Sequence, residues 1–573
     1  MVIKGENHHV LEMLQFSHAG KVDCIYIDPP YNTGARDWKY DNNYVDDSDA
    51  YRHSKWLAFM QRRLLLAKEL LNPECSVLIV TIDEREYLRL GLLLEQVFSG
   101  ERITMVTTSI SAGGISRTGT FGRSAEYIFF VQLGTSRPQP LALNAEWNAV
   151  KTANKEDIYW SRLLRAGTSA LRSDRPNQFY PVFIRNMVAG PVFHAVGEPL
   201  PLGAPNDTTV PDGCVAVWPW RRDGEDGRWQ TSSEGLRELI ASGHARLGQW
   251  KGDRTTIYYL KRGERAKVDR GAYKVTGHRA DGSVITDTTE YSTTFLPTDV
   301  WRLTSHDAGN SGSRLLARLL PGRTFPFPKS LYAIEDGLRF FLIDKPAGVV
   351  LDFFGGSGTT AHAVARLNRQ DGGRRQSIIV TNNEVSATEA DALRAQDYRP
   401  GDPEWEALGI FEHITRPRIT AAVTGLTPDA EPVKGDYKFT DEFPMAEGFE
   451  ENVEFVELTY QDPDDIELDL AFEAIAPLLW LRAGAVGPMI DQRLDSAGRR
   501  KPYAWTERYG VLFSVDRWRS FIEKRPATAT TVFVVTDSQA TFAGIAAELP
   551  DHLDVVRLYE NYLTTFRINE GLV

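Results

Sequence analysis

The chain has 573 residues, of which 42% are apolar and 25% charged, enough apolar sequence for roughly two to four folded units. Its net charge of −12 argues against a polyanionic partner for the chain as a whole. Three cysteines without paired spacing and eleven histidines without metal-ligand spacing argue against a disulfide framework or a metal site. The cysteine pattern also favours a reducing compartment such as the cytoplasm.

Short β-rich runs alternate with helical patterns in the first 135 residues. We expect strands at 22–27, 77–82 and 127–131, and helices at 54–71 and 84–98. Such alternation is typical of βαβ units in a parallel, doubly wound α/β sheet. Sheet signals then stop and resume only with the strands expected at 348–351 and 377–380.

The first strand runs directly into a compact motif, Asp28-Pro29-Pro30-Tyr31. Prolines hold φ near about −65° and so fix the direction of the chain as it leaves the strand. Because Asp and Pro are common turn residues, an ordinary exit from a strand is the alternative interpretation. The continuation Asn32-Thr33-Gly34 and the helix expected at 54–71 favour a functional motif.

A glycine-rich loop follows the strand at 348–351. Its residues are Asp352, Phe353, Phe354, Gly355, Gly356, Ser357 and Gly358, and a helix is expected to begin near Thr359. Glycines let a ligand approach the backbone, and the helix N-terminus presents positive charge to it. The loop fits the dinucleotide fingerprint G-x-G-x-x-A, but not a Walker phosphate loop, because no Lys-Ser or Lys-Thr follows. Glu384, just past the strand at 377–380, can bind ribose hydroxyls.

A third motif, Phe325-Pro326-Phe327-Pro328-Lys329-Ser330, precedes the glycine-rich loop. It lies between helical patterns at 313–320 and 331–342. Alternating Phe and Pro is also typical of a rigid extended linker. Its position between these two helical patterns favours a part in the cofactor site.

Together, the tetrad at 28–31 and the loop at 352–358 resemble the catalytic and cofactor motifs of the β-class amino-methyltransferases, in which the catalytic motif comes first. Within that class the chain is similar to the modification subunits of Type III restriction-modification systems. The resemblance covers about residues 1–426 and implies S-adenosylmethionine as the cofactor. The implied cofactor-binding residues are the loop from Asp352 to Gly358, Thr359, Glu384, and Phe327, Pro328 and Lys329. A nicotinamide cofactor is disfavoured, because the tetrad has no role in hydride transfer.

The implied chemistry explains the residue types of the tetrad. The exocyclic amine of adenine is a poor nucleophile, because its lone pair is delocalised into the ring. Asp28 can accept one N–H of that amine and the Pro29 carbonyl the other, while Tyr31 offers a face for an extruded base. Such stacking is worth about 1–3 kcal/mol in single-strand binders. The rest of catalysis would be the alignment of nitrogen, methyl carbon and sulfur, and it requires no metal and no covalent nucleophile.

The resemblance further implies site-specific methylation of adenine N6 in duplex DNA. It also implies a homodimer and a separate helicase-nuclease partner, or another subunit of a phage-defence system. Enzymes that methylate cytosine N4 typically carry Ser at the position of Asp28, which favours adenine. Alternatives of other kinds are a non-catalytic DNA-binding scaffold, which has no need of that carboxylate, and an RNA methyltransferase, which fits the large insert less well.

Residues 136–324 are predicted to form an inserted module, because the two parts of the sheet, 1–135 and 325–426, must come together. In the family such an insertion carries target recognition, and Phe179-Tyr180-Pro181-Val182 is similar to a landmark there. Residues 151–270 carry nineteen Lys/Arg against fourteen Asp/Glu, which favours contact of nucleic acid with this region. Such a balance is also common on solvated surfaces.

Three arginines of the insert, Arg221, Arg222 and Arg228, are candidates for DNA binding. They lie among tryptophans, where they could grip phosphates or read guanine edges. In the alternative interpretation Trp218 and Trp229 form the core of the insert and the arginines are solvated.

The final segment, 427–573, is expected to be a small α/β domain without a catalytic motif. It is acidic at first, with sixteen Asp/Glu and two Lys between 429 and 473. Strands are expected at 510–515 and 531–535, and helices at 468–481 and 538–549. The apolar stretch 471–490 contains charged residues, so a buried helix is expected rather than a membrane span. A dimer or partner-docking surface and a packing appendage are both consistent with this segment.

Overall fold

The computed structural model describes residues 1–559 except 34, 41–42, 47, 110–113, 115–118, 120, 144, 149–157, 168, 207, 222, 270–272, 288–295, 327, 460–471 and 496. The chain divides into two compact units. The core unit comprises Met1–Trp147 and Phe295–Val573, and the insert unit comprises Asn148–Thr294.

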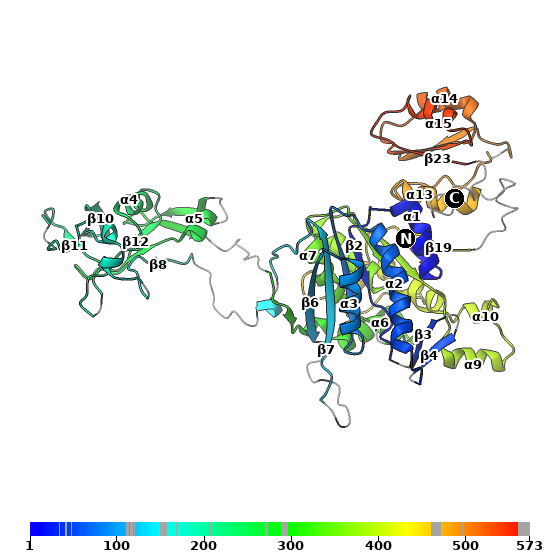
Figure 1. Ribbon diagram of the computed structural model, residues 1–573, viewed down its shortest axis with the longest axis horizontal. Helices are drawn as coiled ribbons and strands as arrows, with labels where there is room; N and C mark the ends of the chain where they lie inside the picture. Colours follow the sequence, from blue (N-terminus) through cyan, green and yellow to red (C-terminus); the bar gives the residue numbers. More distant parts are fainter. Residues whose placement is uncertain are drawn as a thin grey trace. The chain divides into compact units, whose positions relative to one another are not determined.

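A nine-stranded mixed sheet forms the centre of the core unit (Figure 1). The strand order is β16-β6-β7-β5-β2-β17-β18-β1-β19. The strands are β1 (Val2–Lys4), β2 (Cys24–Ile27), β5 (Cys75–Ile82), β6 (Arg102–Ser109), β7 (Ala125–Gly134), β16 (Val300–Trp301), β17 (Val349–Asp352), β18 (Gln376–Thr381) and β19 (Phe455–Glu457). Neighbouring strands are parallel, except that β7 is antiparallel to both β5 and β6.

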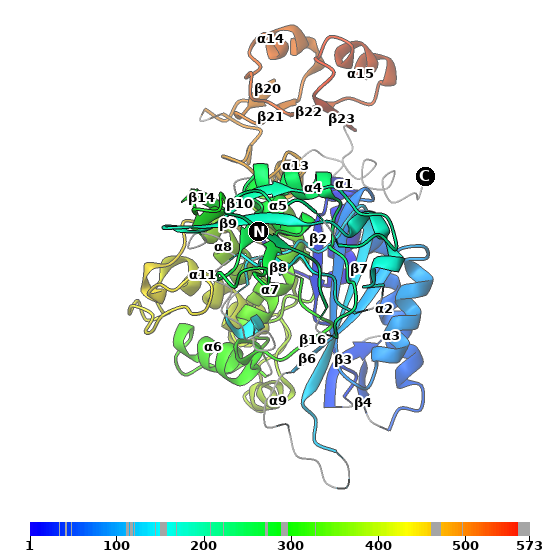
Figure 2. The same cartoon turned by 90° about the vertical axis from the view of Figure 1, so that its left-hand side faces the viewer.

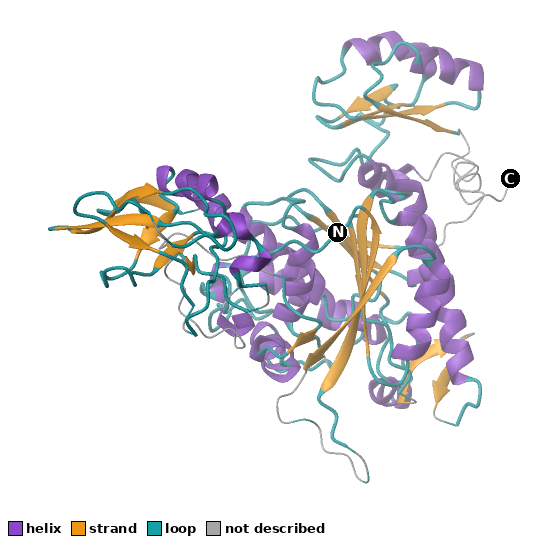
Figure 3. Ribbon diagram, turned by 60° about the vertical axis from the view of Figure 1, so that its left-hand side comes forward, coloured by secondary structure: helices purple, strands orange, loops and turns teal. Residues whose placement is uncertain are grey.

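The central strands are buried on both faces, and alternate residues enter opposite helical layers. In β2, Cys24 and Tyr26 contact one layer, whereas Ile25 and Ile27 contact the other. The first layer contains α7 (Leu331–Leu342) and α8 (Thr359–Asp371), and the second contains α1 (Asn7–His18), α2 (Arg52–Leu70) and α3 (Tyr87–Val97). Figures 2 and 3 show helices on both sides of the sheet. The predicted doubly wound α/β class is therefore confirmed.

The pairing of β7 differs from the prediction. The run 127–131 is a strand, but it is antiparallel to β5, so the expectation of a purely parallel sheet is wrong here. The cause is β6, which sequence analysis missed and which forms an antiparallel pair with β7. β6 contains Arg102 and several Thr residues and is half exposed, so it lacks the apolar run by which the other strands were recognised.

The borders of the predicted domains also differ from those of the structure. The insert unit spans 148–294, which is narrower than the predicted 136–324, because β16 pairs with β6 and α6 (Arg314–Leu319) packs in the core unit. The predicted border at 427 falls between residues that pack together in one hydrophobic core. Tyr437 is fully buried beside α8, and β19 extends the main sheet beyond β1.

The last part of the core unit carries a second sheet, ordered β20-β21-β22-β23. Its strands are β20 (Tyr503–Trp505), β21 (Tyr509–Leu512), β22 (Thr531–Val535) and β23 (Asp554–Leu558). Helices α14 (Trp518–Glu523) and α15 (Gln539–Ala546) cover one face, and α13 (Phe472–Arg482) packs on the other. Arg482 joins this sheet to α1, because it pairs with Asp554 and donates to the Phe16 carbonyl at 2.7 Å. Within the described ranges, no helix is long and apolar enough to cross a bilayer.

The insert unit is built mainly of short antiparallel strands. Two three-stranded sheets have the orders β10-β9-β11 and β12-β13-β8, and β14 pairs with β15. The elements are β8 (Ser161–Arg162), β9 (Val182–Met187), β10 (Gly190–Val196), β11 (Val215–Val217), α4 (Ser233–Ala241), β12 (Ala245–Leu247), β13 (Ile257–Tyr259), α5 (Arg262–Asp269), β14 (Lys274–His278) and β15 (Val284–Asp287). Further elements of the core unit are β3 (Ala35–Tyr40), β4 (Asn43–Asp46), α9 (Ala387–Ala395), α10 (Pro403–Glu406) and α11 (Arg416–Thr424).

Buried charges tie α7 to α8. Glu335 is 1% exposed, accepts a hydrogen bond from Arg366 Nε at 2.6 Å and also pairs with Arg339. We predict that Glu335→Ala lowers the free energy of unfolding of the core unit by about 3–5 kcal/mol, because it leaves the buried Arg366 guanidinium without its carboxylate, while Arg339 keeps its pair with Asp336. Urea denaturation measures this, with Glu95→Ala on the exposed side of α3 as the control. Equal stability of the two variants would contradict the prediction.

Candidate active site

The tetrad and the glycine-rich loop meet where the strand order reverses. From β2 the chain continues to β5 on one side, and from β17 it continues to β18 on the other. β2 and β17 are parallel neighbours, with Cys24 opposite Val350. Asp28 follows β2 and Asp352 ends β17, so both acids lie at the same edge of the sheet. In open α/β sheets, ligands bind at such a reversal, outside the carboxyl ends of the strands.

The tetrad is held by side chains from neighbouring elements. Thr81 Oγ1, on β5, donates to Asp28 Oδ1 at 2.6 Å, and Trp56 Nε1, on α2, donates to the Pro30 carbonyl at 2.7 Å. Asn32 is buried with a left-handed φ of 55°, which Asn adopts more readily than most residues. Its Nδ2 donates to Glu86 at 2.6 Å. The chain therefore leaves β2 through an anchored turn.

Lys329 brings the third motif into the tetrad. Its ammonium lies 2.6 Å from Glu126 Oε2 and 3.3 Å from Asp28 Oδ1, and it donates to the Tyr31 hydroxyl. Sequence analysis grouped Lys329 with the cofactor, whereas the structure places its charged end beside Asp28. Glu126 was missed, because it lies inside β7 and belongs to no motif.

The other end of the third motif lies beside the glycine-rich loop. A methyl group on Gly356 would stand 3.4 Å from the ring of Phe325, so this ring covers the backbone of the loop. Pro328 is buried, and Phe327 lies outside the described residues. The motif therefore spans the distance between the loop and the tetrad.

The charges around Asp28 alternate in sign. Burial raises the pKa of Asp28, the Lys329 ammonium opposes this rise, and the Glu126 carboxylate adds to it. Burial lowers the pKa of Lys329, but the two carboxylates outweigh this effect and raise it above its ordinary value. Arg123 Nη2 lies 2.9 Å from the second oxygen of Glu126. Arg123, Glu126, Lys329 and Asp28 thus form a row of opposite charges.

Asp352 closes the start of the glycine-rich loop. One carboxylate oxygen accepts from the Phe354 N–H at 2.9 Å and the other from the Thr360 hydroxyl at 2.5 Å. Burial raises the pKa of Asp352 to about 7, and the nearby charge of Asp28 adds to the rise. Its main role in this geometry is to fix the backbone between β17 and α8.

The glycines of the loop are required by space and by backbone conformation. A methyl group on Gly355 would stand 2.3 Å from the side chain of Ile379. Gly356 and Gly358 have φ values of 47° and 81°, which glycine adopts without strain. Phe353 is buried in the core, while the ring of Phe354 packs 5.9 Å from that of Phe59 on α2.

A buried arginine holds the loop from the side of α11. Arg418 Nη1 donates to the hydroxyls of Ser357 and Thr359, each at 2.6 Å, and Thr415 donates to the Gly356 carbonyl at 2.6 Å. Burial lowers the pKa of Arg418 to about 10. Within the described part of the chain, its Nε and Nη2 atoms have no hydrogen-bond partner. No sequence motif marks Thr415 or Arg418, because they meet the glycine-rich loop only in the folded chain.

This edge of the sheet fits a nucleoside cofactor. The backbone of Gly355 to Gly358 is open to close approach, and α8 begins at Thr359 without a side-chain cap on its first N–H groups. Such N–H groups suit a carboxylate or hydroxyl of a ligand. Glu384 follows β18, the neighbour of β17, and is partly buried, a position from which a carboxylate can bind ribose hydroxyls.

The three arginines predicted to bind DNA have different surroundings. Arg228 is buried, and its Nε donates to the Ser169 carbonyl at 2.6 Å, so it belongs to the core of the insert unit and not to an exposed contact surface. Arg221 pairs with Asp223 at 2.8 Å and is partly exposed. Arg222 lies outside the described residues. Trp218 and Trp229 are buried, in agreement with the alternative in which tryptophans form the core.

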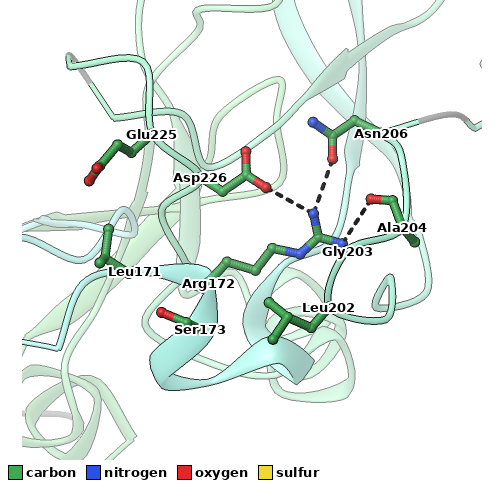
Figure 4. Close-up of a pocket in the computed structure, with 9 residues that line it drawn as sticks. All are labelled: Leu171, Arg172, Ser173, Leu202, Gly203, Ala204, Asn206, Glu225 and Asp226. Atoms are coloured by element: carbon green, nitrogen blue, oxygen red, sulfur yellow. Dashed lines mark hydrogen bonds and ion pairs between the residues drawn. The ribbon is translucent and has the colours of Figure 1, made fainter.

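A pocket in the insert unit is organised by a different arginine, Arg172 (Figure 4). Its guanidinium lies 2.9 Å from Asp226, and it donates to the carbonyls of Pro201 at 2.6 Å and Ala204 at 3.3 Å. It also stacks 4.0 Å from the centre of the Phe179 ring. These internal partners give Arg172 a structural role in joining the loops around the pocket.

Comparison with known proteins relates the site to one family. The pattern of the N6_N4_Mtase family, described as DNA methylase, matches residues 22–191 and 247–423. The chain belongs to this DNA methylase family. The matched segments contain the tetrad, Glu126, Lys329, the glycine-rich loop and Arg418. The predicted resemblance is thus confirmed at the level of the family.

Individual relatives of this DNA methylase are distant. The Type III restriction-modification enzyme EcoPI Mod subunit of Escherichia phage P1 is 28% identical over 421 residues, which are 67% of this chain and 58% of the relative. The Type II methyltransferase M.KpnI of Klebsiella pneumoniae is 27% identical over 387 residues, 66% and 79% of the two chains. Among solved structures, the M1.HpyAVI–SAM complex is 10% identical with a TM-score of 0.26, and the match covers 67% of this chain and 93% of that one. The chain therefore spans somewhat more than half of the EcoPI relative.

We predict that, as the pH rises, the free energy of unfolding of this DNA methylase falls relative to that of the Asp352→Asn variant. The folded pKa of about 7 lies above the ordinary 3.8, so the fold favours the protonated acid. The stabilisation that the fold gains from protonated Asp352 is complete below about pH 4. It is lost towards pH 7, at roughly 1.4 kcal/mol per pH unit. The melting temperature of the variant relative to the wild type should therefore rise over this range and level off above it. Asp391→Asn, on an exposed side chain, is the control, and a difference independent of pH would refute the assignment.

We also predict that Arg228→Met destabilises the insert unit by roughly 2–3 kcal/mol, because several buried acceptors lose a charged donor. Arg221→Met should leave stability nearly unchanged, as expected for an exposed pair. Hydrogen exchange of peptides from the insert unit measures both effects. Unchanged protection in Arg228→Met together with weakened DNA binding would restore Arg228 as a contact residue.

Proposed function

We propose that this chain is a site-specific DNA methyltransferase that moves a methyl group from S-adenosylmethionine to the N6 amine of adenine in duplex DNA. The observation that carries the proposal is the adjacency of the tetrad and the glycine-rich loop at the carboxyl ends of β2 and β17. Direct transfer requires donor and acceptor to be aligned in one site, and neighbouring strand ends provide this. Membership of the DNA methylase family supports DNA as the substrate.

The tetrad acts on the amine. The Asp28 carboxylate accepts one N–H and the Pro29 carbonyl accepts the other, which draws the nitrogen lone pair out of conjugation with the ring. Thr81 positions the carboxylate before the substrate arrives. Tyr31, whose hydroxyl is fixed by Lys329 and lies 3.3 Å from Glu126, supplies a flat surface for the extruded base.

When bound, S-adenosylmethionine supplies an electrophilic methyl group on a positively charged sulfur. Gly355 to Gly358 and the N-terminus of α8 hold the cofactor, and Glu384 binds its ribose hydroxyls. Phe325 covers the loop and helps to exclude water. Arg418 keeps the loop in shape through its hydrogen bonds to Ser357 and Thr359.

Adenine is the proposed base because Asp28 stands where cytosine N4 enzymes typically carry Ser. The insert unit is the proposed target-recognition region. Relatives named as Type III Mod subunits support a role in restriction-modification or another form of phage defence. On the same ground we propose a homodimer in the cytoplasm, with a helicase-nuclease subunit as a further partner.

The test is to incubate the purified protein with unmethylated genomic DNA and methyl-tritiated S-adenosylmethionine, and then to identify the labelled nucleoside. We expect N6-methyladenine, reduced at least about a hundredfold in Asp28→Ala, because an acceptor used in the transition state is lost. Asp391→Ala, with a side chain that is 78% exposed, should retain full activity. Label in N4-methylcytosine would overturn the assignment of the base. Absence of label despite cofactor binding would favour a scaffold, or an enzyme that requires its partner.

A further inference from the structure

We infer that Lys329, anchored by Glu126, is a positioning residue that keeps the Asp28 carboxylate ionised and in place for the target amine. The inference rests on the proposed function and adds two residues to the machinery of the same site. It differs from the cofactor-binding role that the resemblance implied for Lys329.

Three segments that are distant in sequence supply this cluster. Asp28 follows β2, Glu126 lies on β7, and Lys329 precedes α7. The Lys329 ammonium has three N–H donors and three acceptors around it, namely Glu126 Oε2 at 2.6 Å, Asp28 Oδ1 at 3.3 Å and the Tyr31 hydroxyl. Its side chain is 16% exposed, so water competes little for these bonds. The ammonium is therefore held at one point beside Asp28.

Asp28 needs this cation, because its role requires the ionised acid. A protonated carboxyl would present a donor to the amine and lose acceptor capacity. Burial favours the protonated form, and the neighbouring Glu126 charge adds to that preference. The other titratable groups facing the site, Tyr26, Tyr31 and Asp352, bring no positive charge. Lys329 is the cation that opposes them.

Glu126 fixes Lys329 although its own charge acts against Asp28. One Glu126 oxygen binds Lys329, and the other binds Arg123, whose guanidinium also lies 3.1 Å from Glu84. Glu126 is therefore anchored on both sides and is 12% exposed at its side chain. A lysine carries a flexible four-carbon stem, so this anchor reduces the positions open to the ammonium.

The experiment is to measure kcat/KM for unmethylated duplex DNA between about pH 6 and pH 8, at saturating S-adenosylmethionine, with the full-length protein. Relative to the wild type, Lys329→Met should lose more activity at the acidic end than at the alkaline end, by up to about tenfold when one pKa moves by a unit. Lys329→Arg keeps the charge and should follow the pH dependence of the wild type. Glu126→Gln removes a like charge that raises the pKa of Asp28, so its activity relative to the wild type should rise towards low pH.

A role limited to fastening the third motif predicts a different result. In that case Lys329→Met would lower kcat/KM by the same factor at every pH, and that outcome overturns the inference. A rise in the KM for S-adenosylmethionine with an unchanged pH profile would also overturn it, in favour of a cofactor role. Melting temperatures identify any variant that fails to fold. If Lys329→Met fails to fold, Glu126→Gln decides. A kcat/KM that rises towards low pH relative to the wild type supports the inference, and one lowered by the same factor at every pH overturns it. A wild type inactive at every pH would instead count against the proposed function, on which the inference rests.

Discussion

The parallel pairing of β2 with β17 is the constraint on which the site depends. It joins Cys24 and Ile25 to Val350 and Leu351, although more than half of the chain lies between them. Both strands are buried between helical layers, so a slip of one residue would turn their apolar side chains towards the wrong layer. The register therefore fixes where Asp28 and Asp352 emerge. The insert unit is compatible with this pairing, because β16 returns the chain to the same sheet.

Two acids emerge at this edge, and their surroundings differ. Asp352 accepts bonds from a backbone N–H and a hydroxyl, and burial raises its pKa to about 7. Asp28 is only partly buried, and it has the Lys329 ammonium beside it. Here Asp352 shapes the loop and Asp28 serves as the acceptor.

The sequence was sufficient for those parts of the site that are local in the chain. The tetrad and the glycine-rich loop each follow an apolar strand directly, and α7 begins and ends at the residues predicted, 331 and 342. β1, β16 and β19 were missed because two or three residues carry too little pattern to recognise. β7 was recognised as a strand, but its direction depends on its neighbour β6 and not on its own residues.

Contacts between distant segments could not be predicted from the sequence. Lys329 and Glu126 are about two hundred residues apart, and only the sheet brings them to Asp28. The burial of Arg228 and Arg418 likewise depends on packing, since charged residues near tryptophans or helices are more often exposed. The presence of an arginine in the sequence therefore does not show whether its side chain is buried in the fold or exposed to DNA.

The most direct test of the account is a crystal structure of the protein with a non-reactive S-adenosylmethionine analogue and duplex DNA. We expect the analogue to lie along Gly355 to Gly358, and the amine of an extruded adenine to lie within hydrogen-bond distance of Asp28. An analogue bound away from this loop, or a target amine that does not reach Asp28, would contradict it.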